Sequence, residues 1–113
     1  MIDLFKALSE ESRLRILSLL LDDEMCVCEI EASLKTTQSN ASRHLTVLKK
    51  CGILESYKKA QWAYYRVSDK FKMENKLLWD YLQQRLIELP SYNADRNESQ
   101  CYKEKDLCTN RNN

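Results

Sequence analysis

Two cysteines, Cys26 and Cys28, are separated by a single residue and lie just ahead of a segment with helical spacing. Two thiols at this separation can converge on one soft ion while the backbone there is still extended. The start of a helix favours the thiolate, which is the form that binds metal. The pair therefore indicates a metal or redox site, and the ordinary alternative is two small core residues.

A second group of residues suited to chemistry lies further along the chain, on the outer positions of an expected helix and in a following hairpin. Their amide, hydroxyl and guanidinium groups can hydrogen-bond to base edges, and their lysines can contact phosphates. They are Gln38, Ser39, Asn40, Ser42, Arg43, His44, Lys49, Lys50, Lys58 and Lys59. A solvated helix face is an equal alternative for any one of them, whereas the cluster favours nucleic acid. We expect His44 on the exposed face beside Arg43, as a DNA contact rather than a metal ligand.

The distribution of charge supports this interpretation. The formal net charge is only +1, yet residues 35–66 contain seven Lys or Arg residues against Glu55 alone. Residues 1–34 contain three basic and eight acidic residues. A nearly neutral chain with a basic middle third is typical of a protein with a polyanion-binding surface.

The composition excludes several classes of protein. The 113 residues contain one Gly and one Pro, so phosphate-cradling loops and dinucleotide fingerprints are excluded. A single His leaves little for nucleophilic catalysis, and we expect no enzyme and no organic cofactor. The longest apolar run is too short to span a bilayer, which predicts a cytoplasmic protein with no membrane contact.

The hydrophobic spacing predicts a mainly α chain with a small β-hairpin. We expect helices near residues 2–8, from 9–12 to about 21, over 28–34, from 38 to about 51, and over 74–89, with strands at 53–57 and 62–67. Residues 58–61 lack the Gly or Asn of a tight turn, which predicts a longer, looser hairpin loop. Residues 1–90 would form one domain, and the polar residues 91–113 a flexible, Cys-containing C-terminal tail.

Two helices joined by a short turn and followed by a basic hairpin are typical of a winged helix-turn-helix. In such folds the second helix of the pair enters the major groove, and its N-terminal half contacts base edges. The last helix, 74–89, has more apolar surface than one face of a small domain needs, which favours a contact with another subunit.

Five segments, in the same order along the chain, are similar to the ArsR/SmtB family of metal-sensing repressors. They are residues 6–17 (KALSEESRLRIL), 26–30 (CVCEI), 38–45 (QSNASRHL), 52–54 (GIL) and 62–67 (WAYYRV). The resemblance covers roughly residues 4–90. It implies a homodimer, joined through the first and last helices, that binds an inverted-repeat operator in double-stranded DNA and dissociates when metal binds.

The Cys26–Val27–Cys28 motif resembles the arsenite-sensing and cadmium/lead-sensing branches of that family. As(III) is therefore the expected inducer, with Cys26 and Cys28 as metal ligands. Because trivalent arsenic commonly takes three thiolates, a third ligand is needed from Cys51, Cys101, Cys108 or an external thiol. The chain departs from the family at Glu31, where the arsenite branch often has its third Cys. We also expect no N-terminal extension of the kind from which the cadmium/lead branch takes further cysteines.

Two alternatives remain open at this point. The same fold could sense Cd(II), Pb(II) or oxidants, the last by forming a disulfide. From a different class, the cysteine pair could belong to a small thiol-disulfide enzyme. No thioredoxin-like βαβ pattern surrounds the pair, however, and the basic helix would then have no role.

Overall fold

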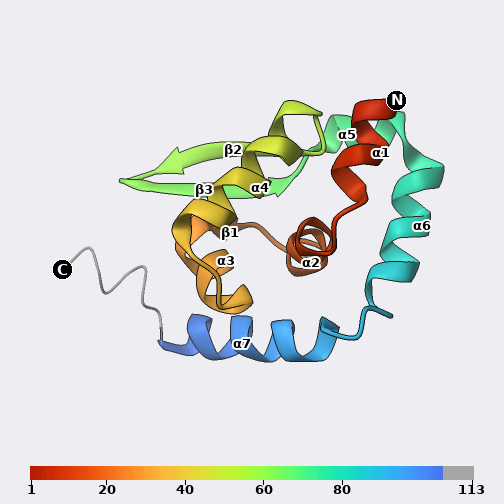
Figure 1. Cartoon of the computed structure of the whole chain (residues 1–113). Coiled ribbons are helices and arrows are strands. Elements are labelled where there is room, and N and C mark those ends of the chain that lie inside the picture. The colour runs from red at the N-terminus through yellow and green to blue at the C-terminus, as the bar shows by residue number, and fades with distance from the viewer. Residues whose placement is uncertain (106–113) are drawn as a thin grey trace.

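A computed structural model of the chain describes residues 1–105, and the side chains of residues 1–101. The elements are α1 (Ile2–Leu8), α2 (Glu11–Leu19), β1 (Met25–Cys26), α3 (Val27–Leu34), α4 (Gln38–Lys50), β2 (Leu54–Lys59), β3 (Trp62–Val67), α5 (Asp69–Glu74), α6 (Lys76–Leu86) and α7 (Tyr92–Lys105). Helix α2 lies at the centre, surrounded by the other helices, and the β-hairpin projects away from them (Figure 1). Among the described helices, none is long and apolar enough to cross a membrane.

Helices α3 and α4 form the expected helix-turn-helix. Lys35 ends α3 in the left-handed conformation, with φ of 55°. The side chain of Thr37 then caps α4 by accepting a hydrogen bond from the backbone N–H of Asn40 at 3.2 Å. Ala41, Leu45 and Leu48, which recur at helical spacing along α4, are fully buried. The mainly helical fold with its short helix–helix turn is thus confirmed.

The sheet has three antiparallel strands in the order β1-β3-β2. Because Lys59 pairs with Trp62, only Ala60 and Gln61 connect β2 to β3, and the expectation of a longer, looser loop is wrong. Ala60 makes the tight turn possible by adopting φ of 58°, a conformation that costs a non-glycine residue about 1 kcal/mol. Strand β1 places Cys26 opposite Tyr64, which joins the start of α3 to the hairpin.

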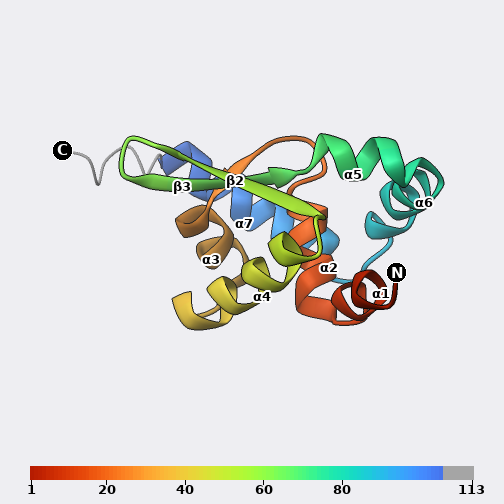
Figure 2. The same ribbon diagram turned by 90° about the horizontal axis from the view of Figure 1, so that it is seen from above.

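The C-terminal part differs from the expectation in two ways. The helix expected over residues 74–89 is α6, which is shorter, and an additional helix that was not predicted, α5, precedes it. Asn75 separates the two helices, because it has non-helical dihedral angles of −127° and 46°. Residues 92–105, expected to be part of a flexible tail, form α7, which packs against α2 and α3 (Figures 1 and 2). Residues 106–113, including Cys108, lie outside the described residues.

Polar side chains hold α7 in place, which explains why a hydrophobic pattern did not reveal it. Asp95 is 3% exposed, and its two carboxylate oxygens accept hydrogen bonds from Arg15 at 2.9 and 2.7 Å. Arg96 pairs with Asp22 and donates to the carbonyl oxygen of Ser18 at 3.2 Å. Charged groups therefore tie α7 to α2 and to the loop after it, while α7 also packs against α3.

Candidate nucleic-acid interface and thiol site

The outer face of α4 carries most of the side chains expected to contact DNA. The exposed members of that set are Gln38, Ser39, Asn40, Ser42, Arg43, Lys49 and Lys50 on α4, with Lys58 and Lys59 on the hairpin. The hairpin tip and the N-terminal half of α4 lie at the same end of the molecule in both views (Figures 1 and 2). The N-terminal half of α4 and the hairpin tip thus present polar and basic groups at one end of the fold, whereas Lys49 and Lys50 lie in the last turn of α4.

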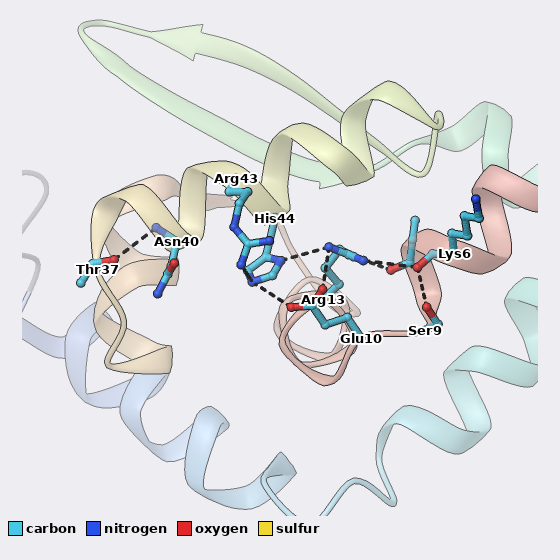
Figure 3. A network of polar contacts seen from close by, with 9 residues as sticks. Lys6, Ser9, Glu10, Arg13, Thr37, Asn40, Arg43 and His44 are labelled. Carbon is cyan, nitrogen blue, oxygen red and sulfur yellow. Dashed lines mark hydrogen bonds and ion pairs between the residues drawn. The ribbon is translucent and has the colours of Figure 1, made fainter.

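His44 is the exception, and the exposed position expected for it is wrong. Its side chain is buried, with 5% exposure, on the inner side of α4 (Figure 3). The helical repeat explains this position, since residue 44 is three residues after Ala41 and four before Leu48. The spacing of those two core residues was a signal that could have located the ring.

The ring of His44 lies among charged groups from two elements. Its Nδ1 atom is 3.2 Å from Nη1 of Arg13, and its Nε2 atom is 3.4 Å from Oε1 of Glu10 and 3.3 Å from Nη2 of Arg43. Burial lowers the pKa of His44, the Glu10 carboxylate raises it, and the cations Arg43 and Arg13 lower it further. The net effect is a lowered pKa, so the ring is neutral at pH 7.

Arg13 is the buried centre of this network. Its Nε donates to the carbonyl oxygen of Ala7 at 2.6 Å, and its Nη2 donates to that of Lys6 at 3.3 Å. Its Nη1 also forms an ion pair with Glu10 at 3.0 Å. Arg13 does not belong to the apolar repeat of Leu14, Leu17 and Leu21 in the sequence, and that repeat does not indicate these partners.

The two cysteines ahead of α3 come together as their spacing predicts. Cys26 is fully buried and Cys28 is 5% exposed, and the structure pairs their sulfur atoms as a disulfide with a Cα–Cα distance of 5.5 Å. The backbone N–H of Cys26 donates to Oε1 of Glu29 at 3.1 Å, which caps the first turn of α3. The pair packs against Ala32 of α3 and against Trp62 and Tyr64 of β3.

No third thiol joins this pair within the part of the chain whose side chains are described. Cys51 lies at the end of α4 against the main core, where its Sγ donates to the carbonyl oxygen of Leu48 at 3.3 Å. Cys101 is exposed on α7. Among the described residues, no group of three His, Cys, Asp or Glu side chains is arranged to hold a metal ion. The donor set therefore offers a soft ion two buried sulfur ligands.

A helix-turn-helix followed by a basic hairpin is the arrangement of a winged helix-turn-helix. A model for the "Bacterial regulatory protein, arsR family" matches residues 10–56. An uncharacterized HTH-type transcriptional regulator of Methanocaldococcus jannaschii is 44% identical over 78 residues, which are 67% of this chain and 88% of that protein. The chain belongs to the ArsR family, and its relatives are regulators rather than enzymes.

Other relatives have names that refer to resistance to arsenic or cadmium, or to transcriptional activation. The arsenical resistance operon repressor of Escherichia coli is 43% identical over 68 residues, which are 59% of this chain and 58% of that protein. Regulators named for cadmium resistance and the activator HlyU also match. A homodimeric winged helix-turn-helix DNA-binding domain from Mycobacterium bovis has a TM-score of 0.63 and 28% identity, over 77% of this chain and 81% of that one. The expected winged-helix fold is thereby confirmed.

Proposed function

We propose that the chain is a transcriptional repressor that binds operator DNA as a homodimer and dissociates when As(III) binds Cys26 and Cys28. The observation that carries this proposal is the position of the cysteine pair. Both sulfur atoms are buried at the start of α3, between the helix that supports α4 and a strand of the hairpin. A repressor that acts on DNA and needs reduced thiols would work in the cytoplasm.

The proposed DNA contacts follow from the exposed faces of α4 and the hairpin. The N-terminal half of α4 would enter the major groove, where Gln38 and Asn40 can pair with adenine and Arg43 with guanine. Ser39 and Ser42 can reach bases or phosphates. Lys49, Lys58 and Lys59 would contact phosphates and make the affinity dependent on salt.

The proposed dimer uses α1 together with α5 and α6. These helices expose large apolar side chains, namely Ile2 and Phe5 on α1, Met73 on α5, and Leu77 and Tyr81 on α6. Ile2 is 71% exposed and Leu77 is 87% exposed, so a second copy of the chain would remove much apolar surface from water. A twofold dimer would place its two α4 helices on the half-sites of an inverted repeat.

Arsenite would act on this dimer through the thiols. Each As–S bond would form as a thiol proton leaves with one arsenite hydroxide as water, so two bonds release two waters. The disulfide cannot bind arsenite, and the site must first be reduced. A third thiolate would come from Cys101 or Cys108 on either subunit, from Cys51, or from an external thiol.

Two paths lead from the thiols to the DNA-contacting surfaces. The first is α3, which packs against α4. The second is the hairpin, because Cys26 pairs with Tyr64 and the sulfur atoms pack against Trp62. Binding of an ion would shift both, and by linkage operator DNA would weaken arsenite binding by the same factor. A useful repressor needs a coupling of about 1–3 kcal/mol.

The test is a titration of reduced protein with the promoter fragment upstream of its own gene, with and without arsenite. Wild-type protein should bind the fragment with high affinity and release it when arsenite is added. The variant Cys26→Ser/Cys28→Ser should bind equally well and stay bound. The variants Cys51→Ser and Cys101→Ser should bind DNA like wild type, and a weakened release by arsenite in either one would identify the third ligand. Release of the double variant by arsenite would show that the site assignment is wrong.

Redox sensing is a second candidate, favoured by the pairing of Cys26 and Cys28 as a disulfide. A peroxide would take two electrons from the thiols, giving the disulfide and reduced oxygen as water or alcohol. Release of DNA by peroxide alone, reversed by a dithiol reductant, would support this candidate. If Cd(II) or Pb(II) released the protein from DNA at a lower concentration than arsenite does, that metal ion would be the inducer in place of As(III).

A further inference from the structure

The buried network around Arg13 joins three helices that the proposed function uses for different purposes. Arg13 belongs to α2, its carbonyl partners belong to α1, and His44 belongs to α4 (Figure 3). We propose that Arg13 and His44 are positioning residues, which fix the orientation of α4 relative to α1 and thereby set the distance between the two α4 helices of the dimer. This inference rests on the proposed function.

The link to α1 is made through backbone groups at its C-terminal end. The last carbonyl groups of a helix have no partner within the helix, and those of Lys6 and Ala7 accept hydrogen bonds from Arg13. A guanidinium has several donors in one rigid plane, so one side chain can hold two carbonyls and reach a third partner. The end of α1 is therefore tied to α2 by one rigid, planar side chain.

The link to α4 requires a neutral histidine ring. Arg13 and Arg43 can only donate, and a neutral ring accepts at one nitrogen only. We assign the proton to Nε2, because Nδ1 then accepts from Arg13 while Nε2 faces the Glu10 carboxylate, and Arg43 makes no hydrogen bond to the ring. That proton faces Oε1 of Glu10 at 3.4 Å. Arg43, a proposed base contact, lies beside the same nitrogen atom, so the network ends at the surface proposed to bind DNA.

The angle between α1 and α4 determines how far apart the two α4 helices of the dimer lie, and therefore which spacing of DNA half-sites the dimer fits. Helix α1 carries Ile2 and Phe5 of the proposed dimer surface, and α4 carries the proposed base contacts. A change in the angle between α1 and α4 would move the two α4 helices apart or together in a dimer. DNA half-sites lie about 34–36 Å apart, so a dimer with fixed α4 helices should tolerate little change in half-site spacing.

The experiment compares His44→Leu, His44→Asn and Arg13→Lys with wild-type protein. Leucine removes the hydrogen-bond acceptor, whereas the Asn side-chain oxygen can take the place of Nδ1. Lysine keeps the charge of Arg13 but cannot hold all its partners. The control is Arg96→Ala, because Arg96 also links an element to a backbone carbonyl of α2 but lies on α7. Folding and dimerisation of each variant are checked by circular dichroism and sedimentation.

The readout is affinity for two duplexes, namely the site found in the promoter fragment and the same site with one base pair inserted between its half-sites. Wild-type protein and Arg96→Ala should prefer the original spacing by about tenfold or more. His44→Leu and Arg13→Lys should bind the original site about tenfold more weakly, with a spacing preference reduced to less than about threefold. His44→Asn should restore both values toward wild type.

Other outcomes have distinct meanings. A His44→Leu or Arg13→Lys dimer that keeps the full spacing preference, with or without a loss of affinity, would overturn the positioning role. Failure of His44→Asn to restore the preference would also overturn it. Wild-type protein without any preferred duplex would instead show that the proposed function is wrong, and that result is read from the wild type alone.

Discussion

Two buried junctions connect the DNA-contacting surfaces to the rest of the molecule, and they differ in chemistry. The sulfur junction consists of Cys26 and Cys28 packed against Trp62 and Tyr64, with the Glu29 carboxylate bound to the backbone N–H of Cys26. The polar junction consists of Arg13, Glu10 and His44 between α1, α2 and α4 (Figure 3). The first junction supports the hairpin and α3, and the second supports α4 directly.

Because of this difference, the sulfur junction can change its covalent state, whereas the polar junction cannot. Thiols can bind an ion or form a disulfide, so the sulfur junction has alternative covalent states. The polar junction has only protonation as a chemical change, since its guanidinium stays charged and its partners include backbone carbonyls. We therefore expect a signal to enter through the thiols and to act against a scaffold that keeps α4 and α1 together.

The largest expected effect is on the free energy of unfolding, and it compares what each junction contributes to stability. Arg13→Ala should lower the free energy of unfolding by about 3 kcal/mol, because it leaves the Ala7 carbonyl and the buried His44 ring without the Arg13 donor. The Lys6 carbonyl would still accept from Ser9. Cys28→Ala in reduced protein should cost about 1 kcal/mol, since it removes one sulfur atom from a small cluster. Urea denaturation with a reductant present measures both. An equal or larger cost for Cys28→Ala would contradict the view of the polar junction as the scaffold.

The second effect concerns the path from the thiols to the hairpin. Trp62→Leu should reduce the factor by which arsenite weakens DNA binding about threefold to tenfold, because the smaller side chain loses contact with the cysteine pair. The matched control is Tyr57→Leu, whose ring stacks on Tyr64 at 5.7 Å on the same hairpin. The measurement is DNA affinity with and without arsenite. A full response in Trp62→Leu would leave α3 as the path of the signal.

The sequence predicted the helix-turn-helix and the thiol pair because both depend on short-range spacing. Ala41, Leu45 and Leu48 follow the helical repeat, and their burial fixes the orientation of α4. Two cysteines separated by one residue lie on the same side of an extended backbone, so their side chains are close without any tertiary contact. Local patterns of this kind are visible in a single chain without knowledge of tertiary contacts.

The remaining features depend on contacts between distant residues. Helix α7 is held through Asp95 and Arg15, an ion pair between residues 80 positions apart that leaves no hydrophobic repeat. The partners of Arg13 are likewise backbone carbonyls, which have no signature in sequence. The tight turn at Ala60 was missed because its residue is not one that prefers positive φ.

The smallest expected effect is a dependence of stability on pH that arises in the polar junction alone. Burial lowers the pKa of His44 below its ordinary value of 6.5, so the unfolded chain binds a proton before the folded chain does. The stabilising contribution is therefore present above pH 6.5 and is lost as the pH falls through the lowered pKa of the folded state.

For one proton, the slope of this change cannot exceed about 1.4 kcal/mol per pH unit. The measurement is the difference in unfolding free energy between wild type and His44→Asn from pH 7.5 to pH 5.5, where the asparagine does not titrate. Since both proteins keep the same cysteines and carboxylates, their difference isolates the ring of His44. A difference that stays constant over this range would mean that protonation of the ring does not disturb the junction, and that Glu10 compensates for the two neighbouring arginines.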